Sequence, residues 1–361
     1  MADFKLRMFP AADGDCLMLS WGNGGSQRHA LVDFGRASSY RAAKRTLGRI
    51  GTFELCVITH IDADHIAGAV AFFGESEKPF KARHIWFNGY RQLRAAYARQ
   101  QPLGPLSMAQ AEKISTAIAG NGWNWNTQFK STVVSTDSPE SRKVMQIDGG
   151  LQLKLLSPDD DALIAQLPSW ETHLEKARLR IGDAEPADDA ELSDGLVTLR
   201  PDVAQIAPAR FEEDEAIANG SSIAFLAEFA GKRILMTGDA HPGVIERKLK
   251  GLGYSKEKRL QLHCLKVSHH GSRSNTSPEL LELIDCSCFA FSTDGSRHGH
   301  PDDETIAWIL DNDPYRRKRL VFNYPQTRMK NKWCDSGTMK ECNYECAFPD
   351  TDDAGIELDI G

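Results

Sequence analysis

The most constraining feature of the sequence is a cluster of potential metal ligands that directly follows an apolar run. Residues 55–58 read LCVI, which is typical of a buried strand, and residues 59–65 read THIDADH. A strand that ends in a tight turn can direct several side chains toward one point, and imidazole and carboxylate groups are donors that divalent metals bind. The segment therefore predicts a metal site at a strand end, with candidate ligands His60, Asp62, Asp64 and His65.

The residues after this cluster, IAGAVAFF at 66–73, predict a buried helix that begins at His65. The first turn of a helix carries unpaired N–H groups and a partial positive charge, which favour carboxylates and anionic substrate groups nearby. A helix-capping turn that contains two incidental histidines is the alternative, because Asp-x-Asp-His alone is a suitable cap.

Two later segments also place chemically useful residues just after short apolar strands. In ILMTGDA at 234–240 the strand breaks at Gly238, so Asp239 lies past a strand end, where α/β folds place their chemistry. In LKVSHHGS at 265–272, His269 and His270 take the same position. Adjacent residues of an extended strand point to opposite sides, so we expect one histidine to bind metal and the other to support it or contact substrate. His269 is the favoured ligand, and a hydrogen-bonded pair of core histidines is the alternative.

A third histidine-bearing segment, RHGHP at 297–301, predicts a rigid turn that presents His300. The acidic residues 302–304 then suit the N-terminus of a helix. We expect His300 to act on a substrate rather than on a metal, whereas a helix-capping role is the alternative. The candidate catalytic residues are thus Asp64, His270 and His300.

Taken in order, these motifs resemble those of the metallo-β-lactamase superfamily. HIDADH is similar to its His-x-His-x-Asp-His signature with Asp62 in place of the second histidine, as in the hydrolase domain of ComEC-type DNA-uptake proteins and their free-standing relatives. GDCLML at 14–19 and ALVDFG at 30–35 resemble the opening hairpin of the family, whose Asp-x-Gly turn supports the site from behind. NGSSIAFL at 219–226 resembles the strand that precedes the bridging carboxylate, here Asp239.

The resemblance implies an α/β fold, a four-layer αβ/βα sandwich with helical insertions, and a site for two divalent ions, Zn²⁺ or Mn²⁺. It implies that His60 and Asp62 hold one ion, that Asp64, His65 and His269 hold the other, and that Asp239 bridges them. A carboxylate at position 62 hardens the site and makes Mn²⁺ a rival to Zn²⁺. The family's further histidine before the Ser-Ser strand is absent, since residues 216–221 read AIANGS.

A dinuclear site of this kind predicts a hydrolase, because the ions generate a nucleophile from water and neutralise developing charge. The resemblance favours a phosphodiesterase or nuclease, so nucleic acid or another phosphodiester is the expected substrate, and protein partners stay open. Hydrolysis of a small ester, amide or cyclic nucleotide is one alternative, and a regulatory metal-containing protein without turnover is another. The net charge of −7 argues against a broad nucleic-acid footprint, although basic clusters occur at 316–319 and 328–332.

Composition fits an enzyme of one domain, residues 1–361, in which 41% of residues are hydrophobic. We expect no membrane insertion, because no apolar run approaches the ~18 residues that span a bilayer. The N-terminus alternates like a strand and lacks a secretion signal, so we expect a cytoplasmic protein with reduced cysteines. Cys334, Cys342 and Cys346 could hold a structural zinc with a fourth ligand, against the alternative of surface thiols.

Two segments are expected to be insertions. The region 90–130 predicts two helices, the second capped by Ser107 and ending near Gly120. Trp123 and Trp125 then pack in the core or, as the alternative, form a base-stacking platform. The region 158–218 is acidic and predicts a solvated surface segment or a lid over the site.

Overall fold

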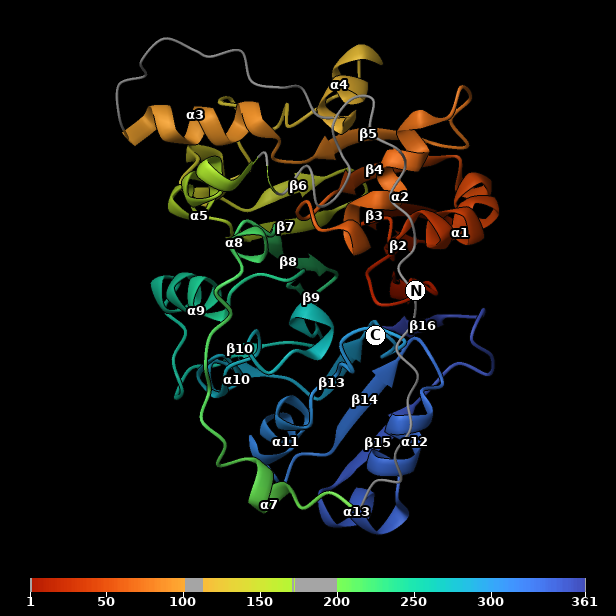
Figure 1. Ribbon diagram of the computed structural model, residues 1–361, viewed down its shortest axis with the longest axis vertical. Coiled ribbons are helices and arrows are strands. Elements are labelled where there is room, and N and C mark those ends of the chain that lie inside the picture. The colour runs from red at the N-terminus through yellow and green to blue at the C-terminus, as the bar shows by residue number, and fades with distance from the viewer. Residues whose placement is uncertain (1, 101–112, 171, 173–199, 361) are drawn as a thin grey trace.

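Two large β-sheets form the centre of the computed structural model, which describes residues 2–100, 113–170, 172 and 200–360 (Figure 1). The first sheet has the order β16 (Ile356–Asp359), β1 (Ala2–Met8), β2 (Leu17–Asn23), β3 (Ser26–Val32), β4 (Thr52–Val57) and β5 (Lys81–Trp86). The second has the order β15 (Tyr344–Ala347), β14 (Lys318–Phe322), β13 (Cys288–Phe291), β11 (Cys264–Lys266), β9 (Lys232–Met236), β8 (Ala224–Phe229), β7 (Leu151–Ser157) and β6 (Met145–Ile147). A small parallel pair joins β10 (Leu260–Gln261) to β12 (Ile284–Asp285).

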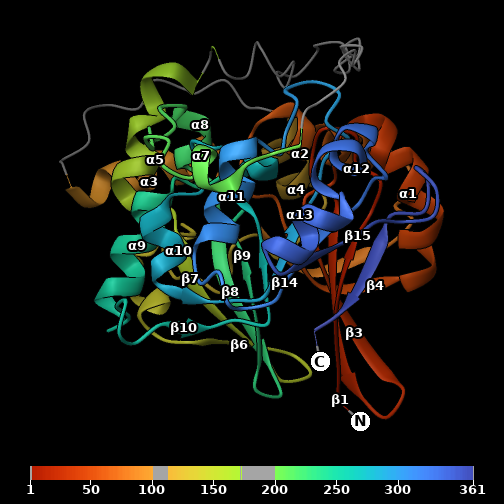
Figure 2. The ribbon, with the colours of Figure 1, turned by 90° about the horizontal axis from the view of Figure 1, so that it is seen from below.

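Each sheet combines an antiparallel and a parallel part. Strands β1, β2 and β3 form an antiparallel meander, and β3, β4 and β5 run parallel. In the second sheet β6 to β9 are antiparallel, whereas β9, β11, β13, β14 and β15 are parallel. The last strand, β16, pairs with the first, β1, so the two ends of the chain lie close together in both views (Figures 1 and 2).

Helices cover the outer faces of both sheets. Beside the first sheet are α1 (Ala37–Ile50), α2 (Ala63–Gly74), α3 (Tyr90–Gln100) and α4 (Lys113–Gly120). Beside the second are α9 (Pro242–Gly251), α10 (Pro278–Glu282), α11 (Asp303–Asp311) and α12 (Thr327–Trp333). Shorter helices are α5 (Asp160–Ala165), α7 (Val203–Ile206), α8 (Ile217–Gly220) and α13 (Ser336–Glu341), and single 3₁₀ turns occur at Pro139–Arg142, Leu167–Ser169 and Ser268–Gly271.

Three buried cores separate these elements into four layers. One core lies between the sheets, and each of the other two lies between a sheet and its helices. The alternation of strand side chains explains this division, because Ile234 and Met236 of β9 face the core between the sheets while Leu235 faces the helices. The apolar runs in the sequence are therefore strands that are buried on both faces. The predicted α/β architecture, two sheets face to face with helices outside, is confirmed.

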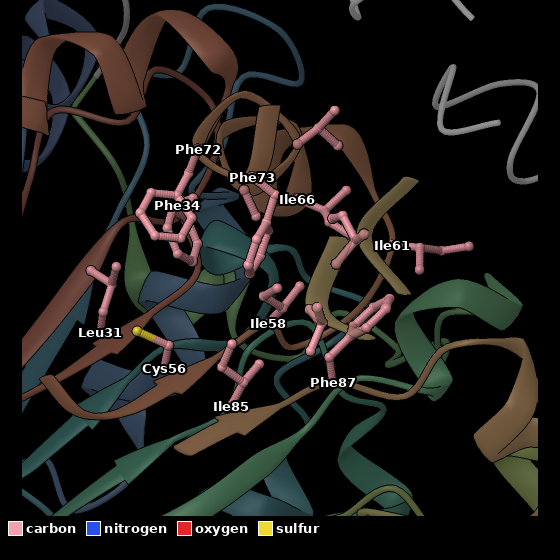
Figure 3. Packing of buried hydrophobic residues seen from close by; sticks show 14 of the residues in the cluster. Leu31, Phe34, Cys56, Ile58, Ile61, Ile66, Phe72, Phe73, Ile85 and Phe87 are labelled. Atoms are coloured by element: carbon pink, nitrogen blue, oxygen red, sulfur yellow. The ribbon is translucent and has the colours of Figure 1, made fainter. Parts of the chain in front are cut away.

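The helix that follows the ligand cluster is held against the first sheet by aromatic packing. Phe72 and Phe73 of α2 lie over Phe34 and Ile58 in the core between this sheet and its helices (Figure 3). The rings of Phe72 and Phe80 stack with centroids 4.5 Å apart. This packing holds the C-terminal end of α2 on the sheet, and at the other end the backbone N–H of Phe34 donates to the carbonyl oxygen of His65 at 3.0 Å.

Gly68 allows the close approach of α2 to the turn after β3, and it gives a test of this packing. A Cβ atom at Gly68 would lie 2.3 Å from the carbonyl oxygen of Phe34. Gly68→Ala is therefore expected to lower the free energy of unfolding by about 1–3 kcal/mol in urea denaturation. Gly74→Ala is the matched control, because a Cβ there meets nothing within 4 Å and alanine favours the helix. Equal stability of the two variants would contradict the close packing at Gly68.

The region 90–130, which is expected to be a helical insertion, contains helices where it is described. Two helices, α3 and α4, occur in region 90–130, while the expected cap Ser107 lies outside the described residues. Trp125 donates from Nε1 to the carbonyl oxygen of Phe87, and Trp123 packs edge-on against Phe72 and Phe73. Both tryptophans thus take part in core packing.

The region 158–218, which is expected to be an acidic insertion, is not purely solvated where it is described. Asp160 is buried and accepts hydrogen bonds from Arg99 at 2.9 Å and Ser135 at 2.6 Å. Asp214 accepts hydrogen bonds from two asparagines beside the site described below. Acidic residues with such partners are structural rather than solvated. The proposed lid falls largely on residues 173–199, which lie outside the described residues.

Cysteines and helices in the described chain bear on two further predictions. Cys16, Cys56 and Cys264 are buried free thiols, which agrees with the expectation of reduced cysteines, and Cys288 is a partly exposed free thiol. The three cysteines near the C-terminus are also free. Among the described residues, they do not belong to a group of side chains that could hold a metal ion. Within the described part of the chain, no helix combines the length and apolar character needed to cross a lipid bilayer.

Candidate metal centre

The candidate ligands come from three chain segments that meet where parallel strands end. His60, Asp62, Asp64 and His65 follow β4 of the first sheet, Asp239 follows β9 of the second, and His269 and His270 follow its neighbour β11. The carboxyl ends of parallel strands are where α/β folds bind ligands. Each sheet thus contributes one part of the site.

The turn after β4 positions the first group. Helix α2 begins at Ala63, two residues earlier than predicted, and Asp64 lies in its first turn. Asp62 is the residue before the helix, yet its side chain makes no capping hydrogen bond. The capping alternative therefore does not describe Asp62, whose side chain is 42% exposed and lies 3.7 Å from His60 Nε2.

Asp239 lies at the centre of the cluster. Its Oδ2 atom approaches the Nε2 atoms of four histidines, at 3.2 Å from His65, 3.7 Å from His60, and 3.8 Å from both His269 and His270. The Asp239 side chain is 2% exposed. A buried carboxylate that faces four imidazoles is suited to a bridging position between cations.

The strand pattern predicted that the two adjacent histidines point to opposite sides. This prediction is wrong. His269 and His270 lie in a 3₁₀ turn with φ angles of 44° and 56°, so the alternation of an extended strand does not apply. Both rings face Asp239, and Gly271 continues the left-handed turn with φ 94°. His270 is almost fully buried, while the His269 side chain is 24% exposed.

Asp64 groups with His270 rather than with His269. Its Oδ2 atom lies 3.2 Å from His270 Nε2 and 3.6 Å from His65 Nε2. The Nε2 atoms of His65 and His270 are themselves only 3.2 Å apart. The geometry therefore favours His65, Asp64 and His270 as neighbours, whereas the resemblance implied His269 beside Asp64.

Hydrogen bonds behind the site fix the orientation of the two deepest imidazoles. His65 Nδ1 lies 2.8 Å from a carboxylate oxygen of Asp33, and His270 Nδ1 lies 2.8 Å from the carbonyl oxygen of Ser292. Both partners can only accept, so Nδ1 carries the proton and donates it. Nε2 of each ring therefore faces Asp239 and is the atom that can bind a cation once it has lost its proton, as in metal-binding histidines.

The other two histidines are oriented through one intermediate residue. Thr59 donates from Oγ1 to Asp33 at 2.7 Å, so this hydroxyl accepts from His60 Nδ1 at 2.9 Å. His269 Nδ1 donates to Asn275 Oδ1 at 2.8 Å. The Asp-x-Gly turn at Asp33 thus supports the site from behind, as predicted.

Negative charges within the cluster oppose the effect of burial on the pKa of the imidazoles. Burial by itself would lower the pKa of His65, but Asp239 and Asp64 raise it well above the usual range. Burial is similarly outweighed at His270, where Asp239 and Asp15 raise the pKa to about 10. An ion that binds here must displace these protons, so metal uptake releases protons and weakens as the pH falls.

Two unpartnered buried atoms show that the residues fit a bound cation. His60 Nε2 and Asp239 Oδ1 are buried and have no hydrogen-bond partner, which is costly unless another group completes the site. His60, His65 and Asp239 together offer ligand atoms that lie within 4.8 Å of one another. Asp15, His65 and His270 form a second such group, but the Asp15 carboxylate is already paired with Lys266 at 2.8 Å.

His300 lies at the exposed side of the cluster. Its ring centroid is 5.5 Å from that of His269, and its Nδ1 atom donates to Asp302 Oδ1 at 3.1 Å. It does not bond a backbone N–H of α11, so the helix-capping alternative is not what the structure shows.

Sequence reasoning missed several residues behind the site. Asp214 accepts from Asn219 at 2.7 Å and from Asn275 at 3.0 Å, and Asn275 also donates to the carbonyl oxygen of Asp239 at 3.1 Å. Asn219, whose Nδ2 atom also lies 3.4 Å from His269 Nδ1, therefore belongs to the network behind His269. The sequence signal was weak, since Asp214 sits in an acidic run and Asn275 in a polar loop.

Comparison with known proteins adds little to this geometry. No family model and no curated protein matches the chain. Among solved structures, the chain is similar to a protein from Parabacteroides distasonis that is provisionally named a metal-dependent hydrolase. The identity is 10%, the match covers 97% of this chain and 99% of that chain, and the TM-score is 0.35.

Proposed function

We propose that this protein is a metal-dependent hydrolase of the metallo-β-lactamase type, with a dinuclear centre that cleaves phosphodiester bonds. The single observation that carries the proposal is the convergence of four histidine Nε2 atoms on Asp239, with each Nδ1 atom held by a partner behind it. Preorganised imidazoles around one buried carboxylate, which bind a cation when they lose a proton, are metal ligands rather than core residues. The order of the sequence motifs supports the family, and the shared core between the sheets supports one domain.

The proposed ligands are Asp239 at the centre, with His60 and Asp62 on one side and Asp64, His65 and His270 on the other. His269 also faces Asp239 and remains a candidate ligand for either side. Two divalent ions, Zn²⁺ or Mn²⁺, would here activate water and stabilise charge on a phosphoryl oxygen.

The chain's own residues would prepare the site in three ways. Asp33 holds His65 directly and His60 through Thr59, so these rings keep their orientation without substrate. Burial of Asp239 excludes competing water from the centre. The two most exposed groups, Asp62 and His269, lie on the side from which a substrate can approach, and His300 lies beside His269.

Metal content tests the dinuclear site directly. Elemental analysis of the purified protein is expected to return close to two ions per chain, because six or seven donors converge on one centre. Treatment with a chelator should remove both ions and leave a folded protein whose activity returns with Zn²⁺ or Mn²⁺. Fewer than one ion per chain, with no gain after incubation with Mn²⁺, would contradict the dinuclear site.

Substrate class is tested with a panel in each metal. Labelled single- and double-stranded DNA, RNA, cyclic dinucleotides and bis-p-nitrophenyl phosphate represent phosphodiesters, and p-nitrophenyl acetate with an amide substrate represents the alternatives. Turnover confined to the phosphodiesters is the expected result. Turnover confined to the ester or amide would replace the proposed activity while keeping the metal site.

A further inference from the structure

A buried ion pair joins the two sheets behind the candidate metal centre. Lys266, the last residue of β11 in the second sheet, lies with its Nζ atom 2.8 Å from Oδ2 of Asp15, just before β2 of the first sheet. The two side chains are 0% and 1% exposed. A buried pair of this kind contributes little net stability, because the loss of hydration offsets the attraction. Its presence therefore points to a role in the site.

Asp15 contacts both parts of that site. Its Oδ1 atom is 3.6 Å from His270 Nδ1, on the side of the ring opposite to Nε2, which faces Asp64. Its backbone N–H donates to the carbonyl oxygen of Asp64 at 3.2 Å. The carboxylate and the backbone of one residue thus connect the ligands of the second sheet to those of the first.

The residues around Asp15 strengthen this connection. A Cβ atom at Gly14 would lie 1.8 Å from the carbonyl oxygen of Asp64, so the turn approaches the ligand segment as closely as only glycine allows. The carbonyl oxygen of Gly14 accepts from Ser292 Oγ at 2.9 Å, and the carbonyl oxygen of Ser292 accepts from His270. The turn before β2 therefore contacts the residue that orients His270.

We propose that Asp15 and Lys266 are a positioning pair that holds His270 against Asp64 across the two sheets. Lys266 fixes the carboxylate behind the imidazole, and a fixed negative charge there strengthens donation from Nε2 to a cation. The inference rests on the proposed metal site, but it assigns the pair to metal affinity instead of to folding. The two roles make opposite predictions for an uncharged replacement.

The test is Asp15→Leu combined with Lys266→Met, which replaces the pair with apolar side chains of similar size. Calorimetric titration of the chelator-treated protein with Mn²⁺ is expected to show an affinity about 10–100-fold weaker than that of the wild type. The thermal midpoint of the metal-free double variant is expected to equal or exceed that of the metal-free wild type. Unchanged affinity with a lower midpoint would show a purely structural pair and overturn the proposal.

Two further variants keep the test decisive. Asp15→Asn with Lys266→Gln removes both charges but keeps a polar contact, and the same loss of affinity is expected. This variant carries the test if the apolar double variant does not fold. Lys318→Met is the matched control, because Lys318 is a buried lysine of β14 whose Nζ donates to the carbonyl oxygen of Asp313 at 2.7 Å. This control should keep the wild-type affinity for Mn²⁺.

The titration of the wild type separates this proposal from the proposed function. Wild-type protein that takes up no Mn²⁺ or Zn²⁺ would sink the metal site and the positioning role together. Wild-type protein that binds metal, with a double variant of equal affinity, would overturn the positioning role alone.

Discussion

Asp239→Asn is expected to remove bound metal and hydrolysis together. The substitution keeps the shape of the side chain but replaces one oxygen of the central carboxylate with an N–H donor, which cannot bind a cation. Four imidazole Nε2 atoms lie within 3.8 Å of Asp239 Oδ2, so no other carboxylate has the same central position among the described residues. Loss of several kcal/mol of transition-state stabilisation corresponds to a fall in turnover of about 10³-fold or more.

Elemental analysis and turnover of bis-p-nitrophenyl phosphate check this result, with circular dichroism to show a native fold. Asp202→Asn is the control, since Asp202 is an exposed residue that caps the short helix α7. That control should keep both ions and full turnover. Two ions per chain in Asp239→Asn, with turnover near that of the wild type, would refute a bridging role for Asp239.

The sequence predicted the parts of the site that depend on local structure. Each ligand segment follows a short apolar strand, so the ends of β4, β9 and β11 could be located from hydrophobic runs and the glycines that break them. The motif order then associated residues that are almost 180 positions apart, such as His60 and Asp239. This step came from the family resemblance, because periodicity alone does not reveal which strands are neighbours.

The failures have two physical causes. The alternation rule failed at His269 and His270 because positive φ angles in a 3₁₀ turn replace strand geometry, and a pattern of residue types does not report φ. Residues that act through tertiary contacts were also missed. The sequence placed Lys266 in a strand and Asp214 in an acidic run, but it did not reveal the role of either residue. That role depends on partners far away in the sequence.

The last prediction concerns His300, whose position suits a role in the chemical step. Its Nδ1 atom donates to Asp302, so the ring is held with Nε2 available, and its side chain is 13% exposed beside His269. Burial lowers the pKa of His300, although Asp302 opposes this effect, so the ring of the free protein is largely neutral near pH 7. The approach of a phosphoryl anion favours the protonated ring, which can then donate to a phosphoryl or leaving oxygen.

His300→Ala is accordingly expected to lower kcat about 10²–10⁴-fold, the usual contribution of a positioned acid or base, with metal content and thermal midpoint unchanged. Asp302→Asn, which keeps an oxygen acceptor for Nδ1, should reduce kcat less. His84→Ala, in the edge strand β5, is the control and should behave as the wild type. The three measurements separate the roles, because loss of metal in His300→Ala would make His300 a ligand, and full turnover would make it a residue of the turn only.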